Sequence, residues 1–205
     1  ATALTLAMIV AACSAHPSDD AGPREESATS TTSTSTISEA PPPAGTPAEL
    51  VEHAVDWPTA GQDLLNTRAA ATSTITSENV DRLTETWRAE LDGAGALSTV
   101  PIVQGDTVYL QSGFGGVYAL DRATGAERWA SDPRGLNIGP FGVAVGDGQV
   151  YGMDGSTGVV ALDAADGAEA WVTDITATDT TGVDIQPVIA DGTVIASSVP
   201  ISIGG

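Results

Sequence analysis

Three tryptophans, Trp87, Trp129 and Trp171, are separated by two equal intervals, because 129 − 87 = 42 and 171 − 129 = 42. Residues 106–129 also align with residues 148–171 without a gap. Each copy consists of short apolar runs separated by turns that are rich in glycine and aspartate. A period near 42 residues with these features predicts the four-stranded blade of a β-propeller, because helical repeats of similar length carry far fewer β-strand signals.

The alternation of apolar residues and the turn residues predict strands for two complete blades and half of a third. The first blade would use residues 98–103, 106–111, 116–120 and 126–130, and the second 141–145, 148–153, 158–162 and 168–172. Residues 185–189 and 193–198 would begin the third. We therefore expect an all-β fold of four-stranded antiparallel blades over residues 56–205, with about two and a half blades present.

The first residues of the chain predict where the protein is located in the cell. Residues 1–12 are apolar and end in Val-Ala-Ala-Cys at residues 10–13, a run too short for a permanent membrane helix. This resembles the end of a bacterial lipoprotein signal peptide, truncated at its start, in which Cys13 carries the lipid. The sequence contains one cysteine, so Cys13 has no disulfide partner within the chain. We expect an extracytoplasmic protein held at the membrane through Cys13; a plain secretory signal with an incidental cysteine is the alternative.

The segment that follows, residues 14–55, is rich in Ser, Thr and Pro, and we expect a disordered acidic tether because this composition cannot bury a core. Both histidines, His16 and His53, lie in or beside the tether and are not expected to act in catalysis or metal binding. The chain has 27 acidic and 7 basic residues, a formal charge of −20. This charge repels phosphate backbones, so we expect no nucleic-acid partner.

Two sequence patterns point to a known family. Residues 57–68 fit W-P-x-x-G-x-D-x-x-N-T-R, and residues 79–87 fit N-V-x-x-L-x-x-x-W. Both resemble the lead-in of the quinoprotein dehydrogenases, propeller enzymes that use pyrroloquinoline quinone (PQQ) and include alcohol and polyvinyl-alcohol dehydrogenases. Residues 119–129 fit the tryptophan-docking pattern of that family, A-x-D-x-x-T-G-x-x-x-W, and residues 161–171 fit it with Asp166 in place of Thr. The resemblance implies a quinoprotein-type propeller with eight blades in the full ring.

The docking pattern also has a physical explanation. Its Asp can accept hydrogen bonds from its own turn, its Gly can take positive φ, and the hairpin then returns the indole against the small Ala. Each indole would wedge between blades, with an apolar burial contribution of ~2–3 kcal/mol. Leu83 replaces the glycine in the copy that ends at Trp87, which predicts a degenerate lead-in strand. The residues assigned this structural role are Ala119, Asp121, Gly125, Trp129, Ala161, Asp163, Gly167, Trp171 and Trp87.

The resemblance further implies PQQ and Ca²⁺ on the propeller axis, covered by a disulfide between adjacent cysteines and held by Glu, Asn and Asp side chains. The cysteine pair would lie near residues 136–140, which contain no cysteine. The calcium-binding Glu would lie within residues 199–203, which contain no carboxylate, and the Asn and Asp would lie beyond residue 205. The acidic turns at Asp147, Asp154 and Asp163 lack the ligand spacing of an EF-hand and are expected to be tight turns. Catalytic, cofactor-binding and metal-binding residues therefore stay unassigned.

Three functions remain open at this point. The first is a lipid-anchored, PQQ-dependent dehydrogenase that oxidises a small alcohol or a polymer, which the lead-in pattern favours. The second is a non-enzymatic propeller with a protein partner, similar to the lipoprotein scaffold of outer-membrane protein assembly, which the missing cysteine pair and Glu favour. The third is a ligand-sensing or polysaccharide-binding propeller, which ranks last because aromatic residues make up 4% of the chain.

Overall fold

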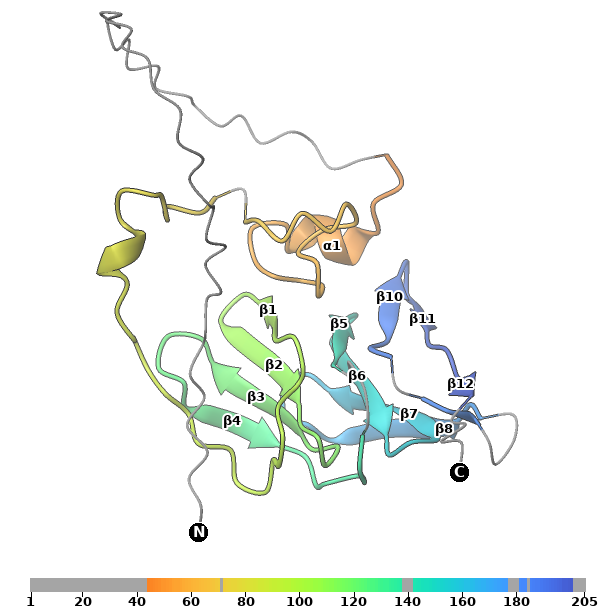
Figure 1. Ribbon diagram of the computed structural model, residues 1–205. Coiled ribbons are helices and arrows are strands. Elements are labelled where there is room, and N and C mark those ends of the chain that lie inside the picture. Colours follow the sequence, from red (N-terminus) through yellow and green to blue (C-terminus); the bar gives the residue numbers. More distant parts are fainter. Residues whose placement is uncertain (1–43, 71, 138–141, 177–180, 184, 201–205) are drawn as a thin grey trace, which may run out of the picture. The chain divides into compact units, whose positions relative to one another are not determined.

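The computed structural model describes residues 44–70, 72–137, 142–176, 181–183 and 185–200. Within them, two four-stranded antiparallel sheets stand side by side and are followed by a two-stranded hairpin (Figure 1). Each sheet has its strands in chain order, as a propeller blade requires. The predicted all-β fold and the partial propeller are confirmed.

The strands follow the predicted order. Blade 1 contains β1 (Ile102–Gln104), β2 (Thr107–Gln111), β3 (Val117–Asp121) and β4 (Glu127–Ala130). Blade 2 contains β5 (Ala144–Gly146), β6 (Gln149–Asp154), β7 (Gly158–Asp163) and β8 (Glu169–Asp174). The third blade is represented by the hairpin of β10 (Val188–Ala190) and β11 (Thr193–Ile195). A separate antiparallel pair joins β9 (Thr181–Gly182) to β12 (Val199–Pro200), and this pair was not predicted.

The innermost strand of blade 1 is shorter than predicted. It begins at Ile102 and not at residue 98. Pro101 immediately precedes it and has no backbone N–H to give to the ladder, which explains the later start. On the other side of β1, Val103 forms an isolated antiparallel bridge with Trp57, so the lead-in segment adds to the inner edge of blade 1.

The two complete blades share one ladder register. Ala119 pairs with Trp129 in blade 1 and Ala161 pairs with Trp171 in blade 2, and each ladder shifts its register at the next residue. The 42-residue repeat in the sequence is therefore a repeat of backbone geometry as well as of residue types.

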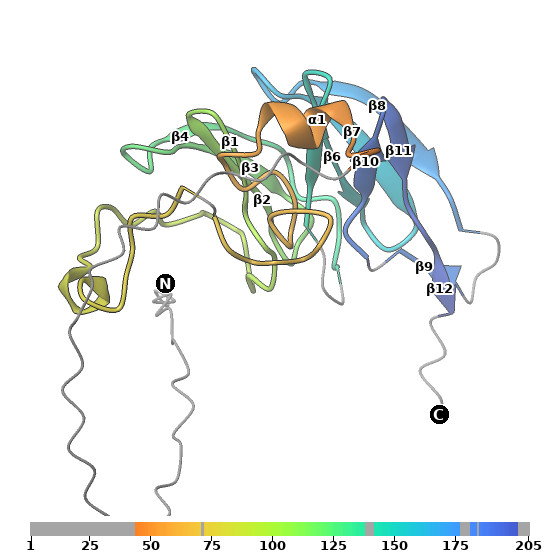
Figure 2. The same cartoon turned by 90° about the horizontal axis from the view of Figure 1, so that it is seen from above.

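The apolar core lies between the blades. One buried cluster joins blade 1 to blade 2, and its members are Ile102, Tyr109, Val117, Ala119, Trp129, Val143, Val145, Val150, Val160 and Leu162. A second cluster packs Leu110, Tyr118 and Leu120 against the lead-in side chains of Trp87, Leu91 and Leu97. A third packs Tyr151 and Ala161 against Ile189 of the third blade. Figure 2 shows the same order in space, with blade 2 between blade 1 and the β10–β11 hairpin.

The segment before the blades differs from its prediction in two places. Residues 44–55 were predicted to belong to a disordered tether, yet they contain helix α1 (Ala48–Glu52), in which Glu49 and Leu50 are buried. The lead-in strand ending at Trp87 was also expected, yet residues 83–97 form no strand and a short 3₁₀ helix, η1 (Val80–Arg82), precedes them. This segment packs on the face of blade 1 through side chains, so it has no ladder partner there.

The membrane-anchor prediction lies outside the described residues. Cys13, residues 1–13 and the tether up to residue 43 all belong to the part that the structure does not describe. Among the described residues, no helix combines the length and the apolar character needed to cross a bilayer.

A buried glutamine also joins the two blades. Gln111, the last residue of β2, is fully buried, and its amide donates from Nε2 to the carbonyl oxygen of Met153 at 2.7 Å. Its Oε1 accepts from the Met153 N–H at 3.0 Å, so one side chain satisfies both backbone groups of a residue on β6. Replacement of Gln111 by an apolar residue would leave both groups buried and unpaired.

We predict that Gln111→Leu lowers the free energy of unfolding by about 1–3 kcal/mol, the usual cost of orphaned buried polar groups. Urea unfolding followed by circular dichroism measures this change. Gln149→Leu serves as the matched control, because the described residues give its side chain no hydrogen bond and the same exchange should cost less than about 0.5 kcal/mol. Equal losses in the two variants would contradict the assigned role of Gln111.

Candidate functional site

The turn between β3 and β4 is organised by a single carboxylate. Asp121 Oδ1 accepts from the backbone N–H of Ala123 at 3.1 Å and of Thr124 at 2.9 Å, and from Thr124 Oγ1 at 2.8 Å. Gly125 closes the turn with φ 72°, a conformation that side chains with Cβ rarely adopt. In blade 2, Asp163 Oδ1 accepts from the N–H of Ala165 at 2.8 Å, and Gly167 has φ 76°. In both turns, therefore, the Asp carboxylate accepts N–H groups of its own turn and the Gly takes a positive φ.

Charge reinforces the first of these turns. The Asp121 carboxylate also pairs with Arg128 of β4 at 2.8 Å, and Arg128 reaches Asp106 at the same distance. The Arg128 hydrogen bond, followed by those of the Thr124 side chain and backbone, lowers the pKa of Asp121 from 3.8 to about 2. Asp121 is therefore an ionised turn anchor throughout the neutral range, and its contacts are all within blade 1.

Two of the repeat tryptophans, Trp87 and Trp129, contact the turn of the following blade. Trp129 Nε1 donates to the carbonyl oxygen of Ala164 at 3.0 Å, and a Cβ added to Gly167 would lie 2.6 Å from Trp129 Cε3. Trp87 repeats the contact one blade earlier, because its Nε1 donates to the Arg122 carbonyl at 2.9 Å and its ring lies against Gly125. Both indoles therefore wedge against a neighbouring turn where only glycine leaves room.

Trp171 has a different environment. It lies on β8 with 38% of its surface exposed, whereas Trp129 is 8% exposed. Its ring contacts Tyr151 at 6.0 Å between centroids, as Trp129 contacts Tyr109 at 6.1 Å. By the 42-residue period, its docking turn would begin at residue 205, which the structure does not describe. The contact of Trp171 within its own blade is thus present, and any contact with a following blade lies outside the described residues.

The lead-in pattern describes one compact loop. The Asp63 carboxylate accepts from the Thr67 N–H at 3.0 Å and from Thr67 Oγ1 at 2.7 Å. The Arg68 N–H donates to the Gly61 carbonyl at 3.0 Å. Asn66 takes a positive φ of 55° and lies so close to Gly61 that no Cβ would fit there. The fixed residues of the pattern are therefore the residues that hold this loop together.

The positions where the family resemblance places cofactor ligands do not supply them. Of residues 136–140, the structure describes Leu136 and Asn137, and of residues 199–203 it describes Val199 and Pro200 in β12. None of these side chains is a thiolate or carboxylate. Over the described ranges, no three His, Cys, Asp or Glu side chains are grouped so that they could hold a metal ion. The residues present therefore do not fit PQQ and Ca²⁺ at these positions, and no reaction step is assigned to them.

Arg134 is a junction residue that the sequence patterns did not reveal. It follows blade 1, and its guanidinium contacts Asp154 at 3.1 Å and Glu169 at 2.7 Å, both in blade 2. Burial opposes its charged form, but the hydrogen bonds of Glu169 and Asp154 prevail and raise the pKa of Arg134. No local pattern identifies this residue, because its partners are 20 and 35 positions away.

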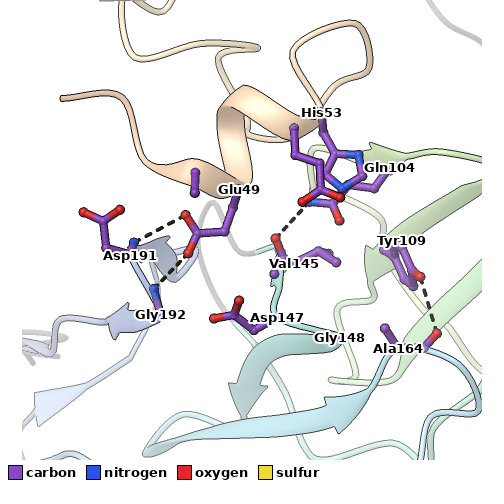
Figure 3. A pocket seen from close by; sticks show the side chains of 13 residues that line it. Glu49, His53, Gln104, Tyr109, Val145, Asp147, Gly148, Ala164, Asp191 and Gly192 are labelled. Atoms are coloured by element: carbon purple, nitrogen blue, oxygen red, sulfur yellow. Dashed lines mark hydrogen bonds between the residues drawn. The ribbon is translucent and has the colours of Figure 1, made fainter. Parts of the chain in front are cut away.

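A cavity of about 530 Å³ lies at the end of the strands where β5 turns into β6 (Figure 3). Its walls come from helix α1, from the turn between β5 and β6, and from the turn between β10 and β11. His53 lines it and is 3.4 Å from Asp56, so this histidine belongs to the folded part of the chain.

Comparison with known proteins places this architecture in a family. A family model described as outer membrane protein assembly factor BamB, a model of PQQ-like repeats, matches residues 52–202. The chain belongs to the PQQ-like β-propeller repeat family. The match covers both complete blades, the third-blade hairpin and both lead-in patterns.

Curated relatives in this family include quinoprotein dehydrogenases. Quinohemoprotein alcohol dehydrogenase of Comamonas testosteroni is 32% identical over 79 residues, which is 38% of this chain and 11% of that protein. Quinoprotein glucose dehydrogenase of Escherichia coli K12 is 33% identical over 98 residues, which is 43% of this chain and 12% of that protein. The chain thus spans about an eighth or less of the length of these two relatives.

Solved structures agree with the fold. Quinohemoprotein alcohol dehydrogenase from Pseudomonas putida HK5 superposes with a TM-score of 0.66 at 26% identity, over 73% of this chain and 23% of that one. The enzyme from Comamonas testosteroni gives 0.65 at 27% identity, over 72% and 24%. The chain therefore corresponds to roughly a quarter of each solved enzyme chain.

We predict that Gly167→Ala destabilises the chain more than Gly148→Ala does. Both glycines have nearly equal φ, 76° and 75°, so the conformational cost of about 1–2 kcal/mol is shared. A Cβ at Gly148 meets nothing within 4 Å, whereas one at Gly167 meets the Trp129 ring, which adds about 1–3 kcal/mol of overpacking. Urea unfolding measures both variants, and the Trp129 contact would be refuted by equal costs.

Proposed function

We propose that this chain is part of an extracytoplasmic, lipid-anchored quinoprotein-type propeller that serves the oxidation of an alcohol. The lead-in loop carries this proposal. Its fixed residues follow the dehydrogenase pattern, and Gly61, Asp63 and Thr67 make the contacts that define the loop. The alcohol dehydrogenases that superpose on the chain at 26% and 27% identity support the same branch of the family.

A second function is favoured by a different observation. Residues 136–140 contain no cysteine and residues 199–203 contain no carboxylate, although the dehydrogenase resemblance implies both. A non-enzymatic propeller that binds another protein needs neither, and the matching family model is described by an outer-membrane assembly factor. Because propellers host many functions, the cofactor site and not the fold must decide between the two.

We predict that the product of the complete reading frame binds PQQ in the presence of Ca²⁺ through ligands outside residues 1–205, and oxidises alcohols with an artificial electron acceptor. Quenching of tryptophan fluorescence on PQQ addition measures binding, and dye reduction measures turnover. A control titration with EDTA in place of Ca²⁺ should abolish both signals, since the metal would act as the Lewis acid. Absence of PQQ binding by a folded full-length product would reject the enzyme and leave the protein-binding propeller.

The membrane anchor has its own test. We predict that Cys13→Ser moves the protein from the membrane fraction to the soluble fraction, because the serine cannot carry the thioether-linked lipid. Incorporation of an alkyne-labelled fatty acid should be lost in the same variant and kept in Ser14→Ala, the matched neighbour. Labelling that persists in Cys13→Ser would overturn lipidation at this residue.

A further inference from the structure

Residues 47–57 cross the ends of the innermost strands of three blades. At the C-terminal end of this segment, Trp57 and Val103 exchange two backbone hydrogen bonds of 3.1 and 2.9 Å. Asp56 accepts from the Gly105 N–H at 2.8 Å and pairs with Arg122 at 2.8 Å. This end is therefore fixed to blade 1 by backbone and side-chain contacts together.

The N-terminal end of the segment contacts the third blade in two ways: Leu50 is buried beside Val188 and Ile189 of β10, and the Glu49 carboxylate binds the β10–β11 turn. Glu49 Oε1 accepts from the Gly192 N–H at 2.9 Å, and Oε2 accepts from the Asp191 N–H at 3.3 Å. Asp191 and Gly192 form a two-residue hairpin turn with φ values of 49° and 69°, whose two N–H groups are not used by the ladder. A single carboxylate therefore satisfies both groups, across 143 residues of sequence.

Among the described residues, no Arg or Lys side chain lies around Glu49. Figure 3 shows its carboxylate directed at the turn, with the Asp147 carboxylate beside it. The titratable side chains that line the cavity around it are Glu52 and His53 from its own segment, Tyr109 from β2, Asp147 from the β5–β6 turn and Asp191 from the β10–β11 turn. No arginine of the described part of the chain lines this cavity, and the described contacts of the buried Glu49 carboxylate are those with the backbone N–H groups of Asp191 and Gly192.

We propose that residues 47–57 form a strap across three blades, and that protonation of Glu49 releases the strap from the β10–β11 turn of the third blade while its other end stays attached. The two ends respond differently to acid for a structural reason. At the Trp57 end the Asp56 carboxylate can also be protonated, but the Trp57–Val103 backbone bonds do not titrate and remain. At the other end, the carboxylate contacts of Glu49 weaken when the group becomes neutral. Release would widen the cavity that the strap covers and would leave blade 1 as the hinge.

The direction of the pH effect follows from the same contacts. The N–H of Gly192 lowers the pKa of Glu49 below its ordinary value of 4.5, aided by the N–H groups of Glu49 and Asp191 and opposed by burial. A group whose pKa is lower in the folded protein stabilises it fully above the unfolded-state pKa. The contact of Glu49 with the turn is thus formed at neutral pH. It is lost as the pH falls below 4.5 toward the lower pKa that Glu49 has in the folded protein.

Hydrogen exchange on the full chain tests the strap. At pH 7, Glu49→Gln should raise the exchange rate of the Asp191 and Gly192 amides about tenfold, because a neutral acceptor holds them more weakly. Glu52→Gln is the matched control, since it removes an equal charge from the same helix at a residue for which the described contacts include no hydrogen bond. It should leave the turn unchanged, and the Val103 amide should stay protected in both variants.

A second measurement keeps the proposal testable if Glu49→Gln does not fold. In the unaltered chain, exchange corrected for its intrinsic pH dependence should accelerate at Asp191 and Gly192 below pH 4.5, and not at Val103. Equal protection of the turn amides in both variants, or simultaneous loss of protection at Val103 and Gly192, would overturn the proposal that acid releases only the Glu49 end of the strap.

Discussion

The indole of Trp129 against the turn at Gly167 is the contact on which the arrangement of the blades depends. It requires a glycine at positive φ, a carboxylate that shapes the turn, and a small residue beneath the ring. Asp163 and Gly167 belong to the β7–β8 turn of blade 2, whereas the small residue, Ala119, lies on β3 of blade 1, so the contact joins the outer strand of one blade to the outer turn of the next. The apolar cluster between blades 1 and 2 lies inside this contact and includes Trp129 itself.

The shortage of cations influences how the remaining charges are held. Three of the seven arginines, Arg122, Arg128 and Arg134, pair with carboxylates at turns or blade junctions. With 27 acidic residues, most carboxylates cannot have such a partner. Asp163 and Glu49 instead accept backbone N–H groups of tight turns, which are available wherever a hairpin reverses. In this acidic chain, backbone N–H groups of turns therefore bind carboxylates that surface arginine and lysine would usually pair with.

The features that the sequence could predict are those with local causes. The blade strands, the Asp-Gly turns and the Trp period all arise from residues within one 42-residue repeat. Helix α1 escaped prediction because its five residues carry no helical period and because Glu49 finds its partner in the third blade. Gln111 and Arg134 escaped for a similar reason, since each contacts backbone or carboxylates of the next blade. The predicted lead-in strand failed because residues 83–97 pack on a sheet face, where no edge offers a ladder.

The two ends of the strands have separate roles in this architecture. The docking turns and the strap lie where β1 meets β2 and β3 meets β4, as the Arg122 N–H donated to the Asp106 carbonyl shows. The family resemblance places cofactor ligands within residues 136–140 and 199–203. The described residues of these stretches, Leu136, Asn137, Val199 and Pro200, follow the ends of β4 and β11 that point away from these turns. Residues at one end can therefore change without disturbing the contacts that stack the blades at the other. This separation explains how a chain can keep the docking contacts of Trp87 and Trp129 while lacking a cysteine pair and a carboxylate at the implied ligand positions.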